Sequence, residues 1–199
     1  MALVPATLQT AVSAIFNAMN NMPEGGDTYC AEQMAVALKT FILTGQVATV
    51  DSGAAPAGSY TGAGIGTMTI DSDTLADDLE STFTAGYNNN DLADHMATDI
   101  DNACKADNIV KVTSTGTVVI PGGTSPFSGQ GEGKFTGAKA TIASALQSCF
   151  AAMNNMTTGG NEYYAAQLAV AFNAYLIAGS ISVTLKTPFV SGSGSGKIA

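Results

Sequence analysis

Three glycine-rich segments contain the residues whose type and spacing could most readily do chemistry. They read TGAGIGTM from Thr61, SGQGEGKF from Ser128 and SGSGSGKI from Ser191. Glycines that follow a strand can let backbone amides cradle a phosphate. The spacing here is GxGxG rather than GxGxxG, and no Walker lysine pattern occurs, so we interpret the segments as structural. The residues that we expect to dock onto neighbouring subunits are Thr61, Gly62, Gly64, Gly66, Ser128, Gly129, Gly131, Gly133, Ser191, Gly192, Gly194 and Gly196.

The single histidine, His95, is the next residue that could act as a general base. Its position is occupied by Gln33 and Gln167 in two related segments of the chain. A catalytic base that is replaced by glutamine in two of three copies is a poor candidate. We therefore predict that Gln33, His95 and Gln167 form a ring of neutral polar side chains at the edge of the buried face.

One acidic segment resembles a calcium-binding loop: Asp71-Ser-Asp73-Thr-Leu-Ala-Asp77-Asp78. It lacks the central glycine and the terminal bidentate glutamate of an EF-hand. Helix capping by Asp73 and Thr74 accounts for the same residues. A second acidic cluster, from Asp91 to Asp107, is typical of a solvated helix face that points to solvent or to a basic partner. We predict no metal site.

Cys30, Cys104 and Cys149 are odd in number, far apart and without CxxC spacing. We interpret them as reduced, buried side chains, with one disulfide left open as the alternative. No histidine accompanies them in the pattern, so thiol nucleophile chemistry has no activating partner. We predict that the chain is not an enzyme, and we assign no catalytic residue, cofactor or small-molecule substrate.

The candidate residues described above belong to a threefold internal repeat. Residues 16–47 (FNAMNNMPEGGDTYCAEQMAVALKTFILTGQV) align without a gap on residues 150–181 (FAAMNNMTTGGNEYYAAQLAVAFNAYLIAGSI), and the residue numbers differ by 150 minus 16, which is 134. Half of this offset, 67, leads from Phe16 to Phe83 in a middle copy with a shorter inter-helix loop. Each copy ends with its glycine-rich segment. The predicted repeats are 1–68, 69–135 and 136–199, together one pseudo-trimeric domain.

The hydrophobic periodicity predicts the elements of one repeat. Apolar residues three and four apart, such as Leu8, Val12 and Phe16, predict a first helix, and a second helix ends at Gly45 or Gly179. Period-two runs at 47–50, 109–112 and 181–185 predict strands, and each glycine segment is extended. The predicted fold is mainly helical α+β: three tandem helix-helix-strand-loop-strand repeats with approximate threefold pseudosymmetry and short strands at one end. Stacking as a solenoid is the alternative.

Composition limits the partners of the chain. The net charge is -9 and only 12% of the residues are charged. An acidic chain repels phosphate backbones, so we expect no nucleic-acid binding. No apolar run is long enough to span a bilayer and no basic leader precedes one, so we expect neither a membrane span nor a signal peptide.

The helix-to-strand stretches AVALKTFILTGQV (35–47) and AVAFNAYLIAGSI (169–181), followed by TGAGIG and SGSGSG, resemble small structural proteins of tailed-bacteriophage virions. The resemblance implies a capsid decoration, neck or tail component, made in the host cytoplasm, whose partners are other structural proteins of the same assembly. Docking would use β-augmentation by the glycine segments. The alternatives are a secreted filament or surface-layer subunit, and a carbohydrate-binding adhesion module that stacks sugars on Tyr29, Tyr163 and Tyr164.

Overall fold

The computed structural model describes residues 2–55, 58–186 and 191–199. Within them, the order helix, helix, strand, strand occurs three times. The first set is α1 (Pro5–Met19), α2 (Gly26–Thr44), β1 (Val47–Ala55) and β2 (Gly58–Met68). The second is α3 (Ser72–Thr84), α4 (Asn89–Lys105), β3 (Val110–Ile120) and β4 (Gly123–Thr136). The third is α5 (Lys139–Met153), α6 (Gly160–Ala178), β5 (Ser180–Lys186) and β6 (Ser191–Ile198).

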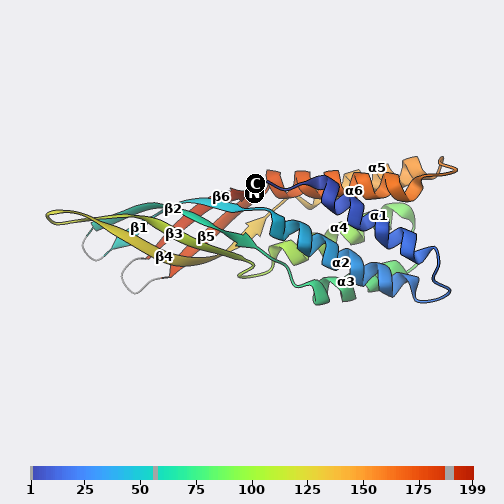
Figure 1. Ribbon diagram of the computed structural model, residues 1–199, viewed down its shortest axis with the longest axis horizontal. Helices are drawn as coiled ribbons and strands as arrows, with labels where there is room; N and C mark the ends of the chain where they lie inside the picture. The colour runs from blue at the N-terminus through green and yellow to red at the C-terminus, as the bar shows by residue number, and fades with distance from the viewer. Residues whose placement is uncertain (1, 56–57, 187–190) are drawn as a thin grey trace.

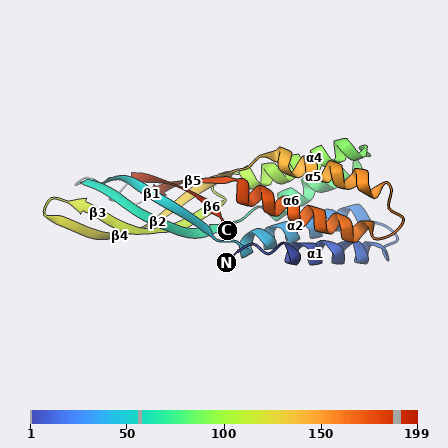
Figure 2. The same cartoon turned by 90° about the horizontal axis from the view of Figure 1, so that it is seen from above.

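The molecule is elongated, with the helices gathered at one end and the strands at the other (Figures 1 and 2). Each helix packs against the helices before and after it in the chain, and α6 returns to pack against α1. The helices therefore form a closed ring rather than the linear stack of a solenoid. None of the helices in the described residues is both long and apolar enough to cross a membrane.

The strands form a closed barrel, and this corrects the predicted fold class. Within the described residues, six antiparallel strands follow the order β1-β2-β3-β4-β5-β6, and β6 pairs with β1. The prediction of a mainly helical α+β fold with short strands at one end is wrong, because the strands reach 14 residues and enclose an interior of their own. The hydrogen bonds that close the barrel join segments far apart in the chain. Local sequence patterns therefore do not predict them.

The core of the helical ring is built from corresponding positions of the three repeats. Leu8, Leu75 and Ile142 are all buried, and their residue numbers differ by 67 at each step (75 minus 8, and 142 minus 75). The second helices bury the larger share of each repeat. Their fully buried side chains include Met34, Leu38 and Ile42 in α2, Met96, Ile100 and Cys104 in α4, and Leu168, Phe172 and Leu176 in α6.

Helix ends are set by local chemistry. The predicted ends of α2 and α6 at Gly45 and Gly179 are confirmed. The predicted cap of α3 by Asp73 and Thr74 is wrong by two residues, because Asp71 is the N-cap: its carboxylate accepts hydrogen bonds from the Asp73 amide (3.0 Å) and from the Thr74 amide and hydroxyl. These hydrogen bonds need an extended residue before the helix, and Asp71 has that backbone conformation.

The cap makes the stability of α3 depend on pH. Hydrogen bonds from the Asp73 and Thr74 amides and from the Thr74 hydroxyl lower the pKa of Asp71. The stabilising contribution is therefore fully present above about pH 4, the ordinary pKa of an unfolded aspartate, and is lost as the pH falls through the lower pKa of the folded state. We expect Asp71→Asn, which caps without a charge, to lose less stability than the wild type on acidification. Thermal unfolding followed by circular dichroism from pH 6 to pH 2.5 measures this, and parallel curves for the two proteins would contradict it.

Candidate functional site

The three glycine segments lie inside the barrel wall rather than on an open surface. Their glycines face inward and their intervening residues face outward, as the alternating burial of β2, β4 and β6 shows. Each segment is hydrogen-bonded on both sides: β2 to β1 and β3, β4 to β3 and β5, and β6 to β5 and β1. Docking by β-augmentation requires a free strand edge. The closed barrel offers none within the described residues, so the expected docking route through these strands is not open.

The inward glycines let the strands approach one another closely. A Cβ on Gly66, Gly133 or Gly196 would lie well inside 3.0 Å of a backbone carbonyl oxygen, that of Lys111, Ser182 or Ala48 respectively. These are the three junctions between consecutive repeats: β2 with β3, β4 with β5, and β6 with β1. The last glycine of each motif therefore allows the strands of consecutive repeats to approach one another closely.

The odd-numbered strands fill the interior that the glycines leave. Asp51, Ser114 and Leu185 are equivalent, because each pairs with the first glycine of its own repeat and the middle glycine of the adjoining one. Large and small residues thus alternate around a narrow barrel. From the helical end outward, the layers of odd-strand residues are Val47, Val110 and Ile181; then Thr49, Val112 and Val183; then Asp51, Ser114 and Leu185.

A polar cluster lies in the second and third of these layers, and Tyr60 of β2 reaches it from beyond the third layer. The Ser114 and Tyr60 hydroxyls are hydrogen-bonded to each other, and the Tyr60 ring packs edge-on against Phe127 at 4.6 Å. Asp51 is 1% exposed and Thr49 4% exposed. Among the described residues, neither Asp51 carboxylate oxygen nor the Thr49 hydroxyl has a hydrogen-bond partner. Asp51 was not among the predicted site residues because the predicted strand ended at residue 50, although the period-two series Val47, Thr49, Asp51 marks it as inward.

An apolar pocket of about 270 Å³ lies in the helical ring, at the level of the equivalent phenylalanines Phe16, Phe83 and Phe150. Tyr164 packs between two of them, with its ring edge-on to Phe16 at 5.3 Å and stacked on Phe150 at 5.7 Å. Burial raises the pKa of Tyr164 far above its ordinary value. Only 4% of Tyr164 is exposed, so its ring packs in the helical core.

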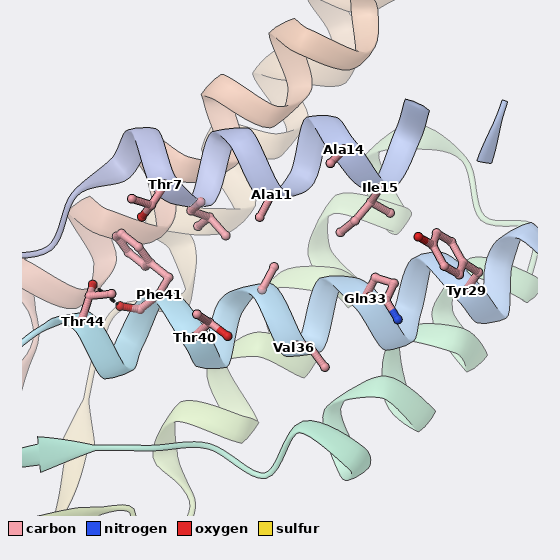
Figure 3. Close-up of a pocket in the computed structure, with 12 residues that line it drawn as sticks. Thr7, Ala11, Ala14, Ile15, Tyr29, Gln33, Val36, Thr40, Phe41 and Thr44 are labelled. Carbon is pink, nitrogen blue, oxygen red and sulfur yellow. Dashed lines mark hydrogen bonds between the residues drawn. The ribbon is translucent and has the colours of Figure 1, made fainter. Parts of the chain in front are cut away.

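A second cavity, of about 470 Å³, lies between α1 and α2 and is shown in Figure 3. Gln33 and Tyr29 line it from α2, facing Ala11, Ala14 and other residues of α1. Tyr29 in α2 and Tyr163 in α6 are both half-buried, and among the described residues no ring contact joins Tyr29, Tyr163 and Tyr164 to one another.

The predicted ring of Gln33, His95 and Gln167 is dispersed over the helices. His95 is exposed and stacks on Tyr87 with ring centroids 4.1 Å apart. Gln167 is half-buried in α6. No hydrogen bond joins any two of these three side chains in the part of the chain that the structure describes. The buried positions are the next residues along each helix: Met34, Met96 and Leu168.

Three acidic residues of the middle repeat join its helices to neighbouring side chains. Asp94 pairs with Lys139 of α5 at 2.8 Å, and Asp99 accepts a hydrogen bond from Thr82 at 2.7 Å. Asp101 is buried and accepts hydrogen bonds from Tyr175 and Lys105, both at 2.7 Å. Among the described residues there is no group of three or more His, Cys, Asp and Glu side chains that could hold a metal ion.

The three cysteines are buried and free, so the alternative of one disulfide is not realised. Burial raises the pKa of all three thiols, that of Cys30 to about 11, with a further contribution from Asp27. Since the thiolate is the reactive form, these positions disfavour nucleophilic chemistry.

We therefore expect the three thiols to react slowly in the native protein. At pH 8, Ellman's reagent should detect fewer than one thiol per folded chain over minutes, and three once guanidinium chloride unfolds it. The native and unfolded samples control for each other, because the same thiols are counted in both. Rapid labelling of Cys104, which is fully buried, would contradict the packing around α4.

The barrel interior, the pocket at the phenylalanines and the α1–α2 cavity are thus the candidate functional features of this chain. Comparison with known proteins found no matching family model, no matching curated protein and no matching solved structure.

Proposed function

We propose that the chain is a non-enzymatic structural subunit that docks onto neighbouring proteins in a larger assembly. The resemblance of its helix-to-strand stretches and glycine segments favours a virion component of a tailed bacteriophage, such as a capsid decoration, neck or tail protein. Its partners are then other structural proteins of the particle. We place the contact with such partners on the helices.

The distribution of exposed apolar and charged side chains on the helices carries this proposal. Val36 and Leu43 of α2 and Val170 and Ile177 of α6 are 46–59% exposed. The two pairs are equivalent, since 170 minus 36 and 177 minus 43 both equal 134, the offset between the first and third repeats. We name these four residues the apolar hairpin face. It consists of two equivalent patches, one on each of two helical hairpins, and these hairpins adjoin where α1 packs against α6.

Charge is sparser on the first and third hairpins than on the second. In the first and third, α1 has no charged residue, α2 has Asp27, Glu32 and Lys39, and α6 has only Glu162, whereas α3 alone carries Asp73, Asp77, Asp78 and Glu80. In α4, the positions equivalent to Val36 and Leu43 are Thr98 and Lys105 (offset 93 minus 31, or 62). Burying neutral and apolar side chains costs little desolvation, which suits the first and third hairpins to a protein interface.

Proteomic analysis of virus particles purified from the source organism tests the proposal. The chain should be present in the particles at a fixed copy number. The double variant V36D/V170D should fold but fail to enter particles, because it places two charges in the interface. Asn90→Asp, which adds a charge at the exposed first turn of α4, is the matched control and should enter normally. Absence of the chain from particles, or normal entry of V36D/V170D, would contradict the proposal.

A further inference from the structure

We propose that the barrel interior binds one hard monovalent cation, of the Na⁺ or K⁺ class, through the Asp51 carboxylate and the Thr49 hydroxyl. The site lies inside the sheet and does not depend on the proposed function, which concerns the outer surface of the helices.

The geometry brings the three oxygens together. Asp51 and Thr49 are both on β1 and both face inward, between β2 and β6. Asp51 Oδ2 and Thr49 Oγ1 both lie within 3.0 Å of the point where a Cβ on Gly64 would stand. Asp51 Oδ1 reaches the other side, next to the position of a Cβ on Gly194. The absence of a side chain on these two glycines of the flanking strands thus makes room for the three oxygens.

The interior is closed at both ends of this cluster. Towards the helices, the apolar layer of Val47, Val110 and Ile181 covers Thr49, and all three of these residues are buried. Towards the hairpin tips, Tyr60 lies two residues beyond Gly62, the strand partner of Asp51, and its ring packs against Phe127. The two oxygens of Asp51 and the hydroxyl of Thr49 are therefore withdrawn from bulk water.

A carboxylate without a partner in the barrel interior would destabilise the folded protein. Removing a charged group from water costs several kcal/mol unless a counter-charge or hydrogen bonds replace the hydration. None of the described residues that face into the barrel is a lysine or arginine. The two equivalent positions pose no such problem, because Ser114 is hydrogen-bonded to Tyr60 and Leu185 is apolar. The first repeat alone carries a carboxyl group at this position, and a bound cation would balance its charge.

The donor set selects the class of ion. All three donors are oxygens, so the soft or borderline metals that favour His and Cys do not fit. Ca²⁺ sites gather six to eight oxygens, usually from several carboxylates. One carboxylate supplies a single negative charge, which a monovalent cation balances. Ser114 lies in the same layer as Asp51, so its hydroxyl, or water, would complete the coordination.

Thermal unfolding at constant ionic strength tests the proposal, with tetramethylammonium chloride replaced stepwise by NaCl or KCl. For the wild type, the midpoint should rise by about 3–5 °C for each tenfold increase in Na⁺ or K⁺ above the dissociation constant. Asp51→Asn, which keeps the shape and removes the charge, should show no such rise. Asp77→Asn removes an exposed carboxylate and should respond like the wild type.

The remaining outcomes discriminate between explanations. An equal rise in the wild type and Asp51→Asn would mean a general salt effect and would overturn the proposal. Flat midpoints for both proteins would overturn it too, because the carboxyl group would then be buried without an ion. A rise with CaCl₂ or MgCl₂ alone would overturn the assignment to monovalent ions. If Asp51→Asn does not fold, Asp51→Ser, which carries the residue of the second repeat, takes its place, and ²³Na relaxation measures binding to the wild type directly.

Discussion

Gly66→Ala is expected to destabilise the protein by about 3 kcal/mol or more, or to prevent it from folding. The added methyl group would collide with the Lys111 carbonyl oxygen and the Val112 Cα of β3, at the junction of the first and second repeats. Backbone atoms cannot rotate away as the end of a side chain can, so the strands must separate and lose ladder hydrogen bonds. Urea unfolding followed by circular dichroism measures the change in the free energy of unfolding.

Gly26→Ala is the matched control for this substitution. Gly26 is the first residue of α2, its φ is not in the left-handed region, and a Cβ there would meet only the end of the Met19 side chain at 3.6 Å. Alanine in a helix also restricts the unfolded chain, so the change should be neutral or stabilising by up to about 1 kcal/mol. Equal effects of the two substitutions would show that close packing between strands does not hold the barrel together.

The repeated order of elements was readable from the sequence because each helix carries its own apolar periodicity. The spacing of Leu8, Val12 and Phe16 places all three side chains on one face of a helix. Gly45 and Gly179 mark the ends of the second helices from the local sequence alone. Such signals lie within one turn or one heptad of the chain. They determine the type of each element without fixing how the elements join in space.

Barrel closure was not readable, for a physical reason visible in the glycine segments. A strand with glycine on one face and Ser or Thr on the other has no apolar face, so its pattern resembles an exposed loop. In β6 the inward face is formed by Gly192, Gly194 and Gly196. These glycines leave room for the inward side chains of the neighbouring strands β1 and β5. The partner strand β1 lies near the other end of the chain: Gly194 pairs with Asp51, and 194 minus 51 is 143.

For the candidate sites too, the sequence singled out residues but did not predict their surroundings. The glycines were singled out correctly as special, but they face the barrel interior and not a neighbouring subunit. Gln33, His95 and Gln167 align in sequence, yet neighbouring side chains differ, and Tyr87 provides a stacking partner for His95 alone. Asp51 continues the period-two series of Val47 and Thr49, but the predicted strand ended at residue 50, and the burial of Asp51 depends on β2 and β6.

Phe172→Ala is expected to destabilise the protein by about 3–5 kcal/mol, the range for truncating a fully buried aromatic side chain. Phe172 is buried in α6, with its ring 6.0 Å from that of Phe41 in α2 and 6.1 Å from that of Tyr175. The alanine variant leaves a cavity between the first and third repeats and removes both aromatic contacts. Denaturant unfolding, compared with that of the wild type, gives the difference in free energy.

Phe172→Leu is the informative control, because leucine is the residue that the first repeat carries at the equivalent position, Leu38, and Ile100 fills it in the second repeat. If the three repeats provide similar surroundings there, leucine should restore most of the packing and cost only about 1–2 kcal/mol. A cost for leucine as large as that for alanine would mean that the third repeat has become specialised around its aromatic ring. Because the ring also contacts Phe41, the size of this cost measures how far the first and third repeats have diverged at their shared core.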